Sequence, residues 1–194
     1  GVLSTDAIPL CAALTAQDTG DARMGLDLLE TAGDIARHED AETVTEEHVR
    51  LARAKVDRAN TERIINNRLT VQMQAVLVAL TLTDLDPETD PKVKEIYPMY
   101  KRVCERAEAD ILSESRVRDH IDTLDMFGLI EASEQNLGRS GGRAYIYDLV
   151  DETQIVVETL RAIDRWERAF PDRTEQLLSK LQSEETSSIQ QDLS

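Results

Sequence analysis

A glycine-rich loop between two short strand-forming runs constrains the fold of this chain more than any other sequence feature. The loop is Gly-Arg-Ser-Gly-Gly-Arg at residues 138–143, and the alternating run Ala144 to Leu149 follows it. Leu129 and Ile130 begin the matching run before the loop. Two such runs around a glycine-rich loop predict a β-hairpin. Because the other periodic segments are helical, this hairpin belongs to a mainly α fold.

Three helical segments precede the hairpin. The first is strongly apolar, is capped by Thr70 and ends before Pro87, because proline cannot continue the helical hydrogen-bond ladder. The second covers about Val93 to Ala107 and contains Pro98. The third runs from Ser113 to Gly128, where glycine favours a left-handed cap. Three helices followed by a hairpin is the element order of a winged helix, a helix-turn-helix with a β wing.

Residues 6 to about 65 contain three further helical patterns and no evident strand. The first covers about Ala7 to Gln17, and the second ends near His38. The third begins at the capping signal Thr43 to Glu47, which places acidic side chains at the positive end of the helix. These segments predict a small helical bundle.

A last amphipathic pattern follows the hairpin, and we expect one helix there. Its apolar positions are Val156, Leu160, Ile163 and Phe170. From Glu184 onward Ser, Thr, Gln and acidic residues dominate, which is typical of disorder. The expected organisation is therefore a helical portion at 1–65, a winged-helix domain at 66–170 and a polar, disordered tail at 171–194.

The formal net charge of −16 argues against nucleic acid at first sight, because nucleic-acid-binding domains are usually basic. The chain has five lysines and seventeen arginines beside 38 acidic residues, a composition that resembles proteins of salt-loving archaea. In molar salt the Debye length is about 3 Å, so dispersed surface charge acts only at contact distance. DNA binding is therefore allowed but needs close local contacts. An acidic protein without a nucleic-acid partner is the alternative.

No feature of the sequence indicates a membrane protein or a disulfide scaffold. The longest apolar run, Ala75 to Leu80, is too short to cross a bilayer, and no signal-peptide pattern is visible. Cys11 and Cys104 lie far apart in helical segments, which favours a reducing cytoplasm. Because the chain begins with Gly1 and runs almost at once into a helix, we expect a cytoplasmic fragment of a longer protein.

The sequence contains no recognisable catalytic or metal-binding motif. It has no Gly-x-x-x-x-Gly-Lys-Ser/Thr phosphate-binding loop, so we expect no ATP hydrolysis and no cofactor in this chain alone. It offers no defensible Ser/His/Asp or Cys/His arrangement, and we assign no catalytic residue. The histidines are too dispersed to form a metal site with either cysteine. They are expected at the surface or at helix caps: His38, His48 and His120.

The helix that begins at Ser113 is the candidate recognition helix. Its apolar positions form one stripe that we expect to be buried: Val117, Ile121, Leu124 and Phe127. The polar positions then face outward or flank that stripe: Ser115, Asp119, Asp122, Arg116, Arg118 and Thr123. Hydroxyls, free backbone N–H groups and a guanidinium in the first turn suit a phosphate or a base edge. The outward aspartates repel phosphates, and a solvated surface helix is the alternative.

The loop of the hairpin is the second candidate for DNA contact. No acidic residue lies between Glu134 and Asp148, although acids occur almost everywhere else. Arg139 and Arg143 bracket three small residues, which are Ser140, Gly141 and Gly142. Glycine lets a backbone approach a groove closely, and arginine is favoured in a narrow minor groove. An ordinary hairpin turn with solubilising arginines is the alternative.

Three segments of the sequence are similar to one protein family. Residues 20–36, which begin Gly-Asp-Ala-Arg, resemble the sensor-2 segment of archaeal AAA+ replication initiators, relatives of the eukaryotic origin-recognition and cell-division-control ATPases. The segment Val44 to Val49 is similar to the start of that family's next lid helix. Residues 115–130 resemble its recognition helix and first wing strand. The similarity covers about residues 2–165, with a departure at Met24-Gly25.

The resemblance implies a role for each candidate residue. Arg23 would be the lid arginine that reaches the nucleotide phosphates, with ATP or ADP and Mg²⁺ bound in the full-length parent. Origin duplex DNA would contact the recognition helix at Ser113, Ser115, Arg116 and Arg118. It would contact the wing at Arg139, Ser140, Gly141, Gly142 and Arg143. The implied function is initiation of DNA replication by sequence-preferring origin binding, and we expect the chain to be monomeric in solution.

Two other functions are compatible with the residues. One is a transcription regulator in which a helical region over 1–65 forms a dimer. The other is an interaction module that docks a protein such as the replicative helicase, which the outward Asp119 and Asp122 fit best.

Overall fold

The computed structural model describes residues 2–4, 7–18, 22–86, 89–136, 143–150, 153–170 and 174. The chain forms two compact units, Gly1–Asn60 and Thr61–Ser194. Most of the segment for which we predict a disordered tail lies outside the described residues.

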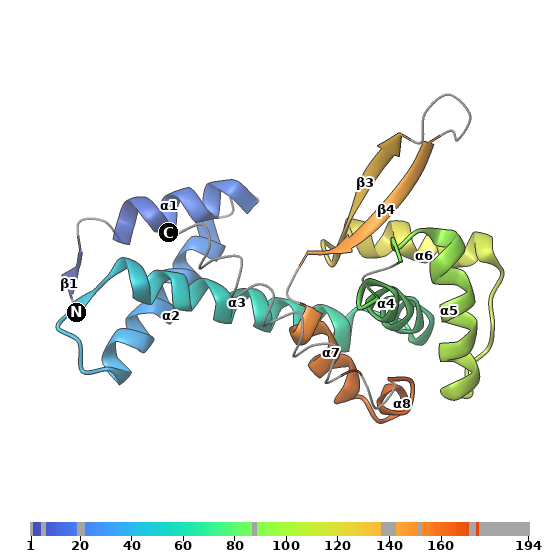
Figure 1. The fold of residues 1–194 in the computed structure, drawn as a ribbon. Coiled ribbons are helices and arrows are strands. Elements are labelled where there is room, and N and C mark those ends of the chain that lie inside the picture. Colours follow the sequence, from blue (N-terminus) through green and yellow to red (C-terminus); the bar gives the residue numbers. More distant parts are fainter. Residues whose placement is uncertain are drawn as a thin grey trace, which may run out of the picture. The chain divides into compact units, whose positions relative to one another are not determined.

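The first unit is a small helical bundle with one short parallel strand pair (Figure 1). It contains β1 (Val2–Leu3), α1 (Ala7–Asp18), α2 (Ala22–His38), β2 (Thr43–Val44) and the first part of α3 (Glu46–Asn67). Its buried core is made of small and branched apolar side chains: Ala7, Cys11, Leu28, Ala32, Ala36, Val44, Val49 and Ala52. The strand pair was not expected from the sequence. In it Val2 pairs with Thr43 and Leu3 with Val44, so each strand depends on a partner about forty positions away in the sequence.

The start of α3 is closed by a histidine. The backbone N–H of Thr45 donates to Nδ1 of His48 at 2.9 Å, and Nε2 of His48 lies 3.0 Å from Oε2 of Glu39. His48 is 6% exposed. Because Nδ1 accepts a hydrogen bond from a backbone donor at the helix start, the ring does the work that Glu or Gln does in a capping box. His48 is therefore a buried cap that joins α3 to the turn after α2.

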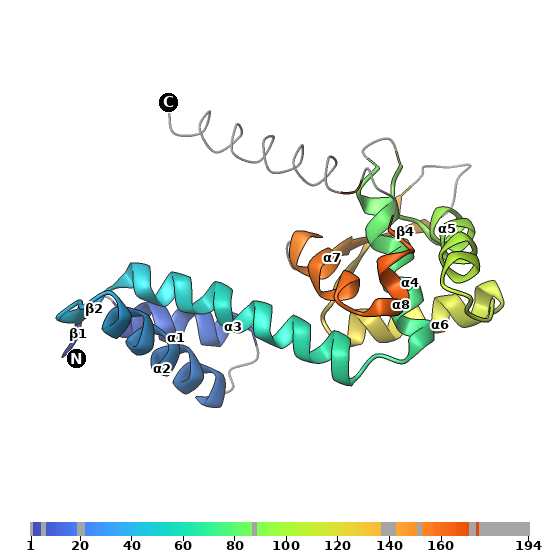
Figure 2. The same ribbon diagram turned by 90° about the horizontal axis from the view of Figure 1, so that it is seen from below.

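The second unit is a winged helix, which confirms the predicted fold class. Its three helices are α4 (Val71–Asp84), α5 (Val93–Arg106) and α6 (Glu114–Met126). The antiparallel wing consists of β3 (Ile130–Asn136) and β4 (Arg143–Leu149), and it projects from the helices in Figure 1. Two further helices follow, α7 (Thr153–Arg161) and α8 (Asp164–Glu167), which lie toward the viewer in Figure 2.

Helix α4 is the centre of this unit. Thr70 caps it as predicted, because its side chain accepts a hydrogen bond from the backbone N–H of Met73. All residues from Gln74 to Thr83 are buried, and α5, α6, α7 and β4 pack around them. The buried hydroxyls of Thr81 and Thr83 donate to carbonyl oxygens one turn earlier at 2.8 Å, so they are satisfied within the helix. A helix that is apolar all round fits this central position.

The segment after the wing differs from the single helix that the sequence predicted. The helix α7 ends at Arg161, and Ile163 begins the short α8 in extended conformation. The short helix α8 carries Trp166, whose side chain is fully buried in the core.

Two helix ends in this unit use a left-handed residue. Gly128, with φ of 73°, follows α6, and the N–H of Leu129 donates back to the carbonyl of Leu124 at 3.1 Å. Glu108, with φ of 51°, follows α5 in the same way, and the N–H of Ala109 donates to the carbonyl of Cys104 at 2.9 Å. This hydrogen-bond pattern is the Schellman motif, in which glycine is the usual residue at the left-handed position.

Candidate nucleic-acid interface

The candidate recognition helix α6 has one fully buried side. Val117, Ile121 and Leu124 are each 0% exposed. Phe127, which we predicted in the same stripe, is only half-buried, and the guanidinium of Arg68 lies 5.9 Å from its ring centroid. The polar positions assigned to the outer face are exposed: Ser115, Arg116, Arg118, Asp119 and Asp122. The outer face of α6 is thus open to a ligand but carries charges of both signs.

The first turn of α6 leaves its polar groups available. Ser113 is the N-cap residue in extended conformation, and its side chain makes no capping hydrogen bond. Arg118 pairs with Glu114 one turn earlier at 3.0 Å, and both side chains are about half exposed. An exposed pair of this kind is worth at most about 1 kcal/mol, so it yields readily to a phosphate. Arg116 forms no ion pair within the part of the chain that the structure describes.

Two tyrosines of α5 fix the residue that precedes this turn. The hydroxyl of Tyr97 donates to the carbonyl of Leu112 at 3.1 Å, and the N–H of Leu112 donates to the hydroxyl of Tyr100 at 3.0 Å. The hydroxyl of Tyr100 in turn donates to the side-chain oxygen of Gln72 on α4 at 2.6 Å. Both backbone groups of Leu112 are therefore held by side chains of the helix before it. We call this arrangement the Leu112 clamp.

Burial keeps the central tyrosine of the clamp neutral. Tyr100 is 0% exposed, and burial raises the pKa of its phenol well above the ordinary value. The phenol is therefore a hydrogen-bond donor at every pH of interest. We had assigned no contact to Tyr97 or Tyr100 from the sequence. Their spacing of three residues, in the helix that precedes the predicted recognition helix, is the signal that could have found the clamp.

The register of the wing shows which residues approach α6. Ile130 pairs with Leu149, Ala132 with Tyr147 and Glu134 with Tyr145. Tyr147 is buried, and Asp122, Arg118 and Asp125 of α6 are among the charges that act on its phenol. Burial is the main cause that raises the pKa of Tyr147. Side chains two positions apart on a strand point to the same face, so Tyr145 continues the face of Tyr147 toward the end of the wing, where it is 47% exposed. We had not singled out Tyr145 from the sequence.

The structure describes the candidate arginines of the wing and the lid only in part. Arg143 is the first residue of β4 and pairs with Asn136. Arg139, Ser140, Gly141 and Gly142 lie outside the described residues. Arg23 lies in the first turn of α2, since that helix begins at Ala22, but its side chain also lies outside what the structure describes.

Other kinds of site find little support in the described residues. Within them, no three His, Cys, Asp or Glu side chains come together in a group that could hold a metal ion. No helix within the same residues is long and apolar enough to span a membrane.

Comparison with known proteins identifies the family of this chain. Residues 1–54 match the Cdc6 AAA+ ATPase-type lid domain, and residues 65–159 match the C-terminal winged-helix domain of CDC6. The chain belongs to the family of Cdc6 and ORC1-type replication proteins. The first unit is accordingly a Cdc6-type lid and the second a Cdc6-type winged helix.

Individual relatives agree with this family assignment. ORC1-type DNA replication protein 8 of Haloarcula marismortui is 38% identical over 162 residues, which is 83% of this chain and 37% of the relative. ORC1-type DNA replication protein 7 of Halobacterium salinarum is 40% identical over 158 residues, or 80% of this chain and 30% of the relative. The chain thus spans about a third of the length of these relatives. Both come from halophilic archaea, which fits the acidic, lysine-poor composition.

The fold is also that of a solved family member. The structure of the Aeropyrum pernix ORC1 protein in complex with DNA matches 88% of this chain and 44% of its own chain, with a TM-score of 0.77 and 32% identity. The lid followed by a winged helix is therefore an arrangement that this Cdc6 and ORC1-type chain shares with an experimentally determined relative.

Proposed function

We propose that this chain is the DNA-binding part of an archaeal replication initiator and that it prefers duplex DNA of replication origins. The observation that carries the proposal is the exposed, unblocked first turn of α6 in a winged helix of the Cdc6 family. The second helix of a helix-turn-helix, which is α6 here, is the element that enters the major groove. A relative of this fold has been solved in complex with DNA, which supports the same type of ligand here.

Each part of the interface has a distinct task in this proposal. Ser113 and Ser115 offer hydroxyls, and Arg116 and Arg118 offer guanidiniums, to phosphates or base edges at the major groove. The wing loop from Arg139 to Arg143 reaches the backbone or the minor groove, where its two arginines supply positive charge. Tyr145 extends the apolar face of the wing toward the same duplex.

The outward aspartates of α6 restrict how the helix binds. Asp119 and Asp122 repel phosphates, so the later turns of the helix must meet base edges or water instead of the backbone. A carboxylate accepts a hydrogen bond from the amino group of cytosine, which lets either residue read that base. The first turn and the wing then supply the phosphate contacts.

The test is DNA binding by the chain in about 1 M potassium chloride, a concentration that suppresses non-specific attraction. An inverted-repeat origin duplex is compared with a scrambled duplex for the parent and the variant Arg139→Ala/Arg143→Ala. The variant Arg37→Ala/Arg50→Ala is the matched control, because it removes two lid arginines and the same charge. We expect preference for the origin duplex and at least about tenfold weaker binding in the wing variant alone, since one good arginine contact contributes about 1–3 kcal/mol. Equal binding by all three proteins would refute the wing assignment.

We further propose that the lid senses nucleotide in the full-length protein. The lid would occupy residues 1–65 and the winged helix residues 66–170. Arg23 would reach the phosphates of ATP or ADP, held with Mg²⁺ by an ATPase domain outside this chain. Its position in the first turn of α2 supports this, because a helix N-terminus and a guanidinium both favour anions. In the full-length parent, Arg23→Ala should impair hydrolysis or nucleotide-dependent switching. Unchanged turnover and switching would reject the role.

A second function is favoured by the outer face of α6. This face combines the exposed acids Asp119, Asp122 and Asp125 with Met126, which is 76% exposed. Such a mixed surface suits a basic protein partner, and the replicative helicase is the partner that the family suggests. Competition between origin duplex and purified helicase for α6 would establish a shared surface, and additive binding would separate the two roles.

A further inference from the structure

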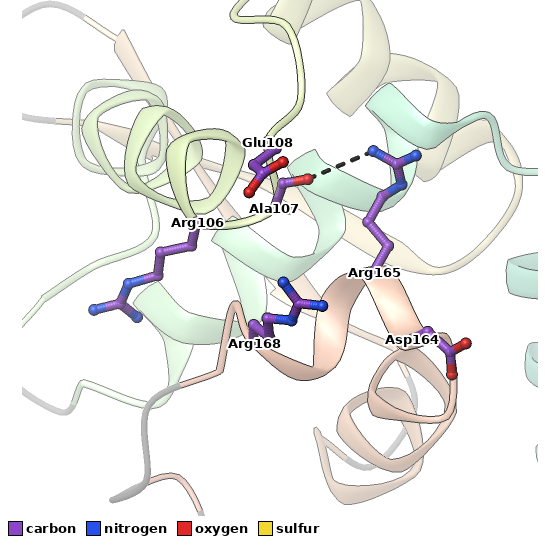
Figure 3. A pocket seen from close by; sticks show the side chains of 6 residues that line it. All are labelled: Arg106, Ala107, Glu108, Asp164, Arg165 and Arg168. Carbon is purple, nitrogen blue, oxygen red and sulfur yellow. Dashed lines mark hydrogen bonds between the residues drawn. The ribbon is translucent and has the colours of Figure 1, made fainter.

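A hollow lined by arginines lies on the winged-helix unit, on the side away from the wing. It is open, has a volume of about 380 Å³ and is formed where the end of α5 meets α8 (Figure 3). Its lining residues are Arg106, Ala107, Glu108, Asp164, Arg165 and Arg168. In Figure 1 the wing projects from the opposite side of this unit to α8, so the hollow and the wing present two separate surfaces.

The three guanidiniums of the hollow have no acidic partner among the described residues. Arg106 donates to the carbonyl of Ala169 at 3.2 Å, and Arg165 approaches the carbonyl of Ala107 at 3.5 Å. Neither they nor Arg168 form an ion pair with any acid in the residues that the structure describes. These backbone contacts orient two of the side chains but leave their charges uncompensated.

Four other described arginines of this acidic chain are paired with carboxylates. Pairs within one helix account for these cases: Arg37 with Asp34, Arg50 with Glu46, Arg53 with Asp57 and Arg118 with Glu114. Arg116 likewise has no acidic partner among the described residues, but the hollow brings three such arginines together in a chain with 38 acidic and 22 basic residues. The arrangement leaves donors available for an external anion.

Two carboxylates also line the hollow and limit what it accepts. Glu108 and Asp164 reduce the formal charge of the lining residues from +3 to +1, and neither lies within ion-pair distance of the three arginines. In Figure 3 Arg168 stands between Arg106 and Arg165 in the view, so the guanidiniums are spread along the hollow. A spread of donors suits an extended anion with several charged oxygens better than a single carboxylate.

We propose that this hollow binds phosphate groups, either two linked phosphates of a small molecule or neighbouring phosphates of a nucleic-acid backbone. Guanidinium forms paired, charge-assisted hydrogen bonds with phosphate oxygens, and it keeps its charge at every physiological pH. The cationic residues that line the hollow are all arginines. A guanidinium binds through directional hydrogen bonds at close range and does not depend on long-range attraction. Such contacts still act in concentrated salt, where long-range attraction is screened.

The test uses the whole chain with nitrogen-15-labelled arginine side chains in potassium chloride of constant concentration. Pyrophosphate is the probe, and the side-chain N–H signals of Arg106, Arg165 and Arg168 are followed during titration. The variant Arg165→Gln/Arg168→Gln removes two donors, since Arg165 makes one long hydrogen bond to the Ala107 carbonyl and Arg168 makes none among the described residues. The variant Arg37→Gln/Arg50→Gln is the matched control, because it changes the net charge equally and lies in the lid.

We expect saturable shifts of all three signals in the parent and in the control. In the hollow variant the remaining Arg106 signal should titrate with an affinity lower by about tenfold or more, since each charge-assisted hydrogen bond contributes appreciably. A parent that shows no saturable shift, or a hollow variant that titrates like the parent, overturns the proposal. An oligo-glutamate peptide that binds more tightly than pyrophosphate also overturns it, because the site would then be one for acidic proteins.

A second arm distinguishes the two sources of phosphate. A random-sequence duplex is added to the variant Arg139→Ala/Arg143→Ala, in which the proposed wing contact is removed. Shifts of the hollow arginines with this duplex identify backbone phosphates as the ligand. Shifts with pyrophosphate alone identify a small phosphate compound. Because the wing is disabled in this arm, its outcome is independent of whether the wing binds origin DNA.

Discussion

The indole nitrogen of Trp166 donates a hydrogen bond to the side-chain oxygen of Gln74 at 2.9 Å, across 92 positions of sequence. The amide nitrogen of Gln74 donates in turn to the carbonyl of Ile65 at 2.9 Å. Gln74 is 8% exposed and Trp166 is fully buried. One glutamine thus joins the end of α3, the central helix α4 and the short helix α8. A buried polar side chain is stable here because each of its two polar atoms has a partner.

Breaking either half of this contact should destabilise the winged helix. Gln74→Leu leaves the indole N–H and the Ile65 carbonyl unpaired, and Trp166→Phe leaves the Gln74 oxygen unpaired and a gap beside it. We expect each change to lower the free energy of unfolding by about 1–3 kcal/mol, measured by urea denaturation. In the double variant the loss of unfolding free energy should be smaller than the sum of the two single losses. Neither the indole N–H nor the Gln74 oxygen is then left buried without a partner. Additive losses would show that the hydrogen bond contributes nothing.

The Leu112 clamp predicts different outcomes for its two tyrosines. Tyr100→Phe removes an acceptor from the Leu112 N–H and a donor from Gln72, so it should lower the free energy of unfolding by about 1–3 kcal/mol. Hydrogen exchange at the Leu112 amide should accelerate at the same time. Tyr97→Phe is the matched control, because its hydroxyl serves only a carbonyl and its side chain is partly exposed. Similar losses in both variants would contradict the clamp as described.

Asp84 should make the stability of this unit depend on pH. Burial raises the pKa of its carboxyl, the hydroxyl of Thr153 lowers it, and the charge of Asp148 raises it further. A pKa that is higher in the folded state favours folding with the proton bound. Stability is therefore greatest below the unfolded pKa and is lost as pH rises through the folded pKa.

The variant Asp84→Asn isolates this contribution. Asparagine keeps an acceptor for Thr153 and carries no charge, so the variant should melt at a higher temperature than the parent at pH 7. That advantage should disappear below the ordinary aspartate pKa of about 3.9, where the parent is also neutral. Thermal unfolding of both proteins across this pH range measures the difference. Parallel curves would show that Asp84 titrates normally.

The two left-handed helix ends predict changes of opposite sign. Gly128→Ala places a Cβ in open space but forces alanine to a φ of 73°, so it should cost about 1 kcal/mol for backbone conformation alone. Glu108→Gly removes a Cβ from a similar conformation after α5 and should be stabilising by about 0.5–1 kcal/mol. Chemical denaturation measures both. If Gly128→Ala has no effect, the backbone there must relax out of the left-handed region.

Local signals account for the part of the fold that could be predicted. The cap at Thr70, the left-handed Gly128 and the strand–loop–strand pattern each depend on neighbours within a few residues, so the sequence displays them directly. Pro98 did not end α5, because it is exposed and water can bind the carbonyl that lost its helical partner. The element order then leads to a winged helix without further information.

Contacts between distant residues account for what was missed. The pairing of Val2 with Thr43, the burial of Trp166 against Gln74 and the tyrosine contacts of Leu112 leave no periodic trace in the sequence. The same reason limits the candidate site. Exposure of Ser115 and Arg116 follows from the helical period, whereas the Arg106, Arg165 and Arg168 hollow joins two segments about sixty positions apart.

The Leu112 clamp separates what holds the recognition helix from what meets a ligand. The recognition helix is held by Tyr97, by Tyr100 and by its buried side. None of these side chains belongs to the outer face of α6. Substitution of Ser115, Arg116, Asp119 or Asp122 therefore leaves the contacts that hold the helix in place unchanged. The contacts that stabilise the recognition helix and the surface that meets a ligand are therefore separate. New sequence preferences can be selected by varying only a few exposed positions, without loss of the fold.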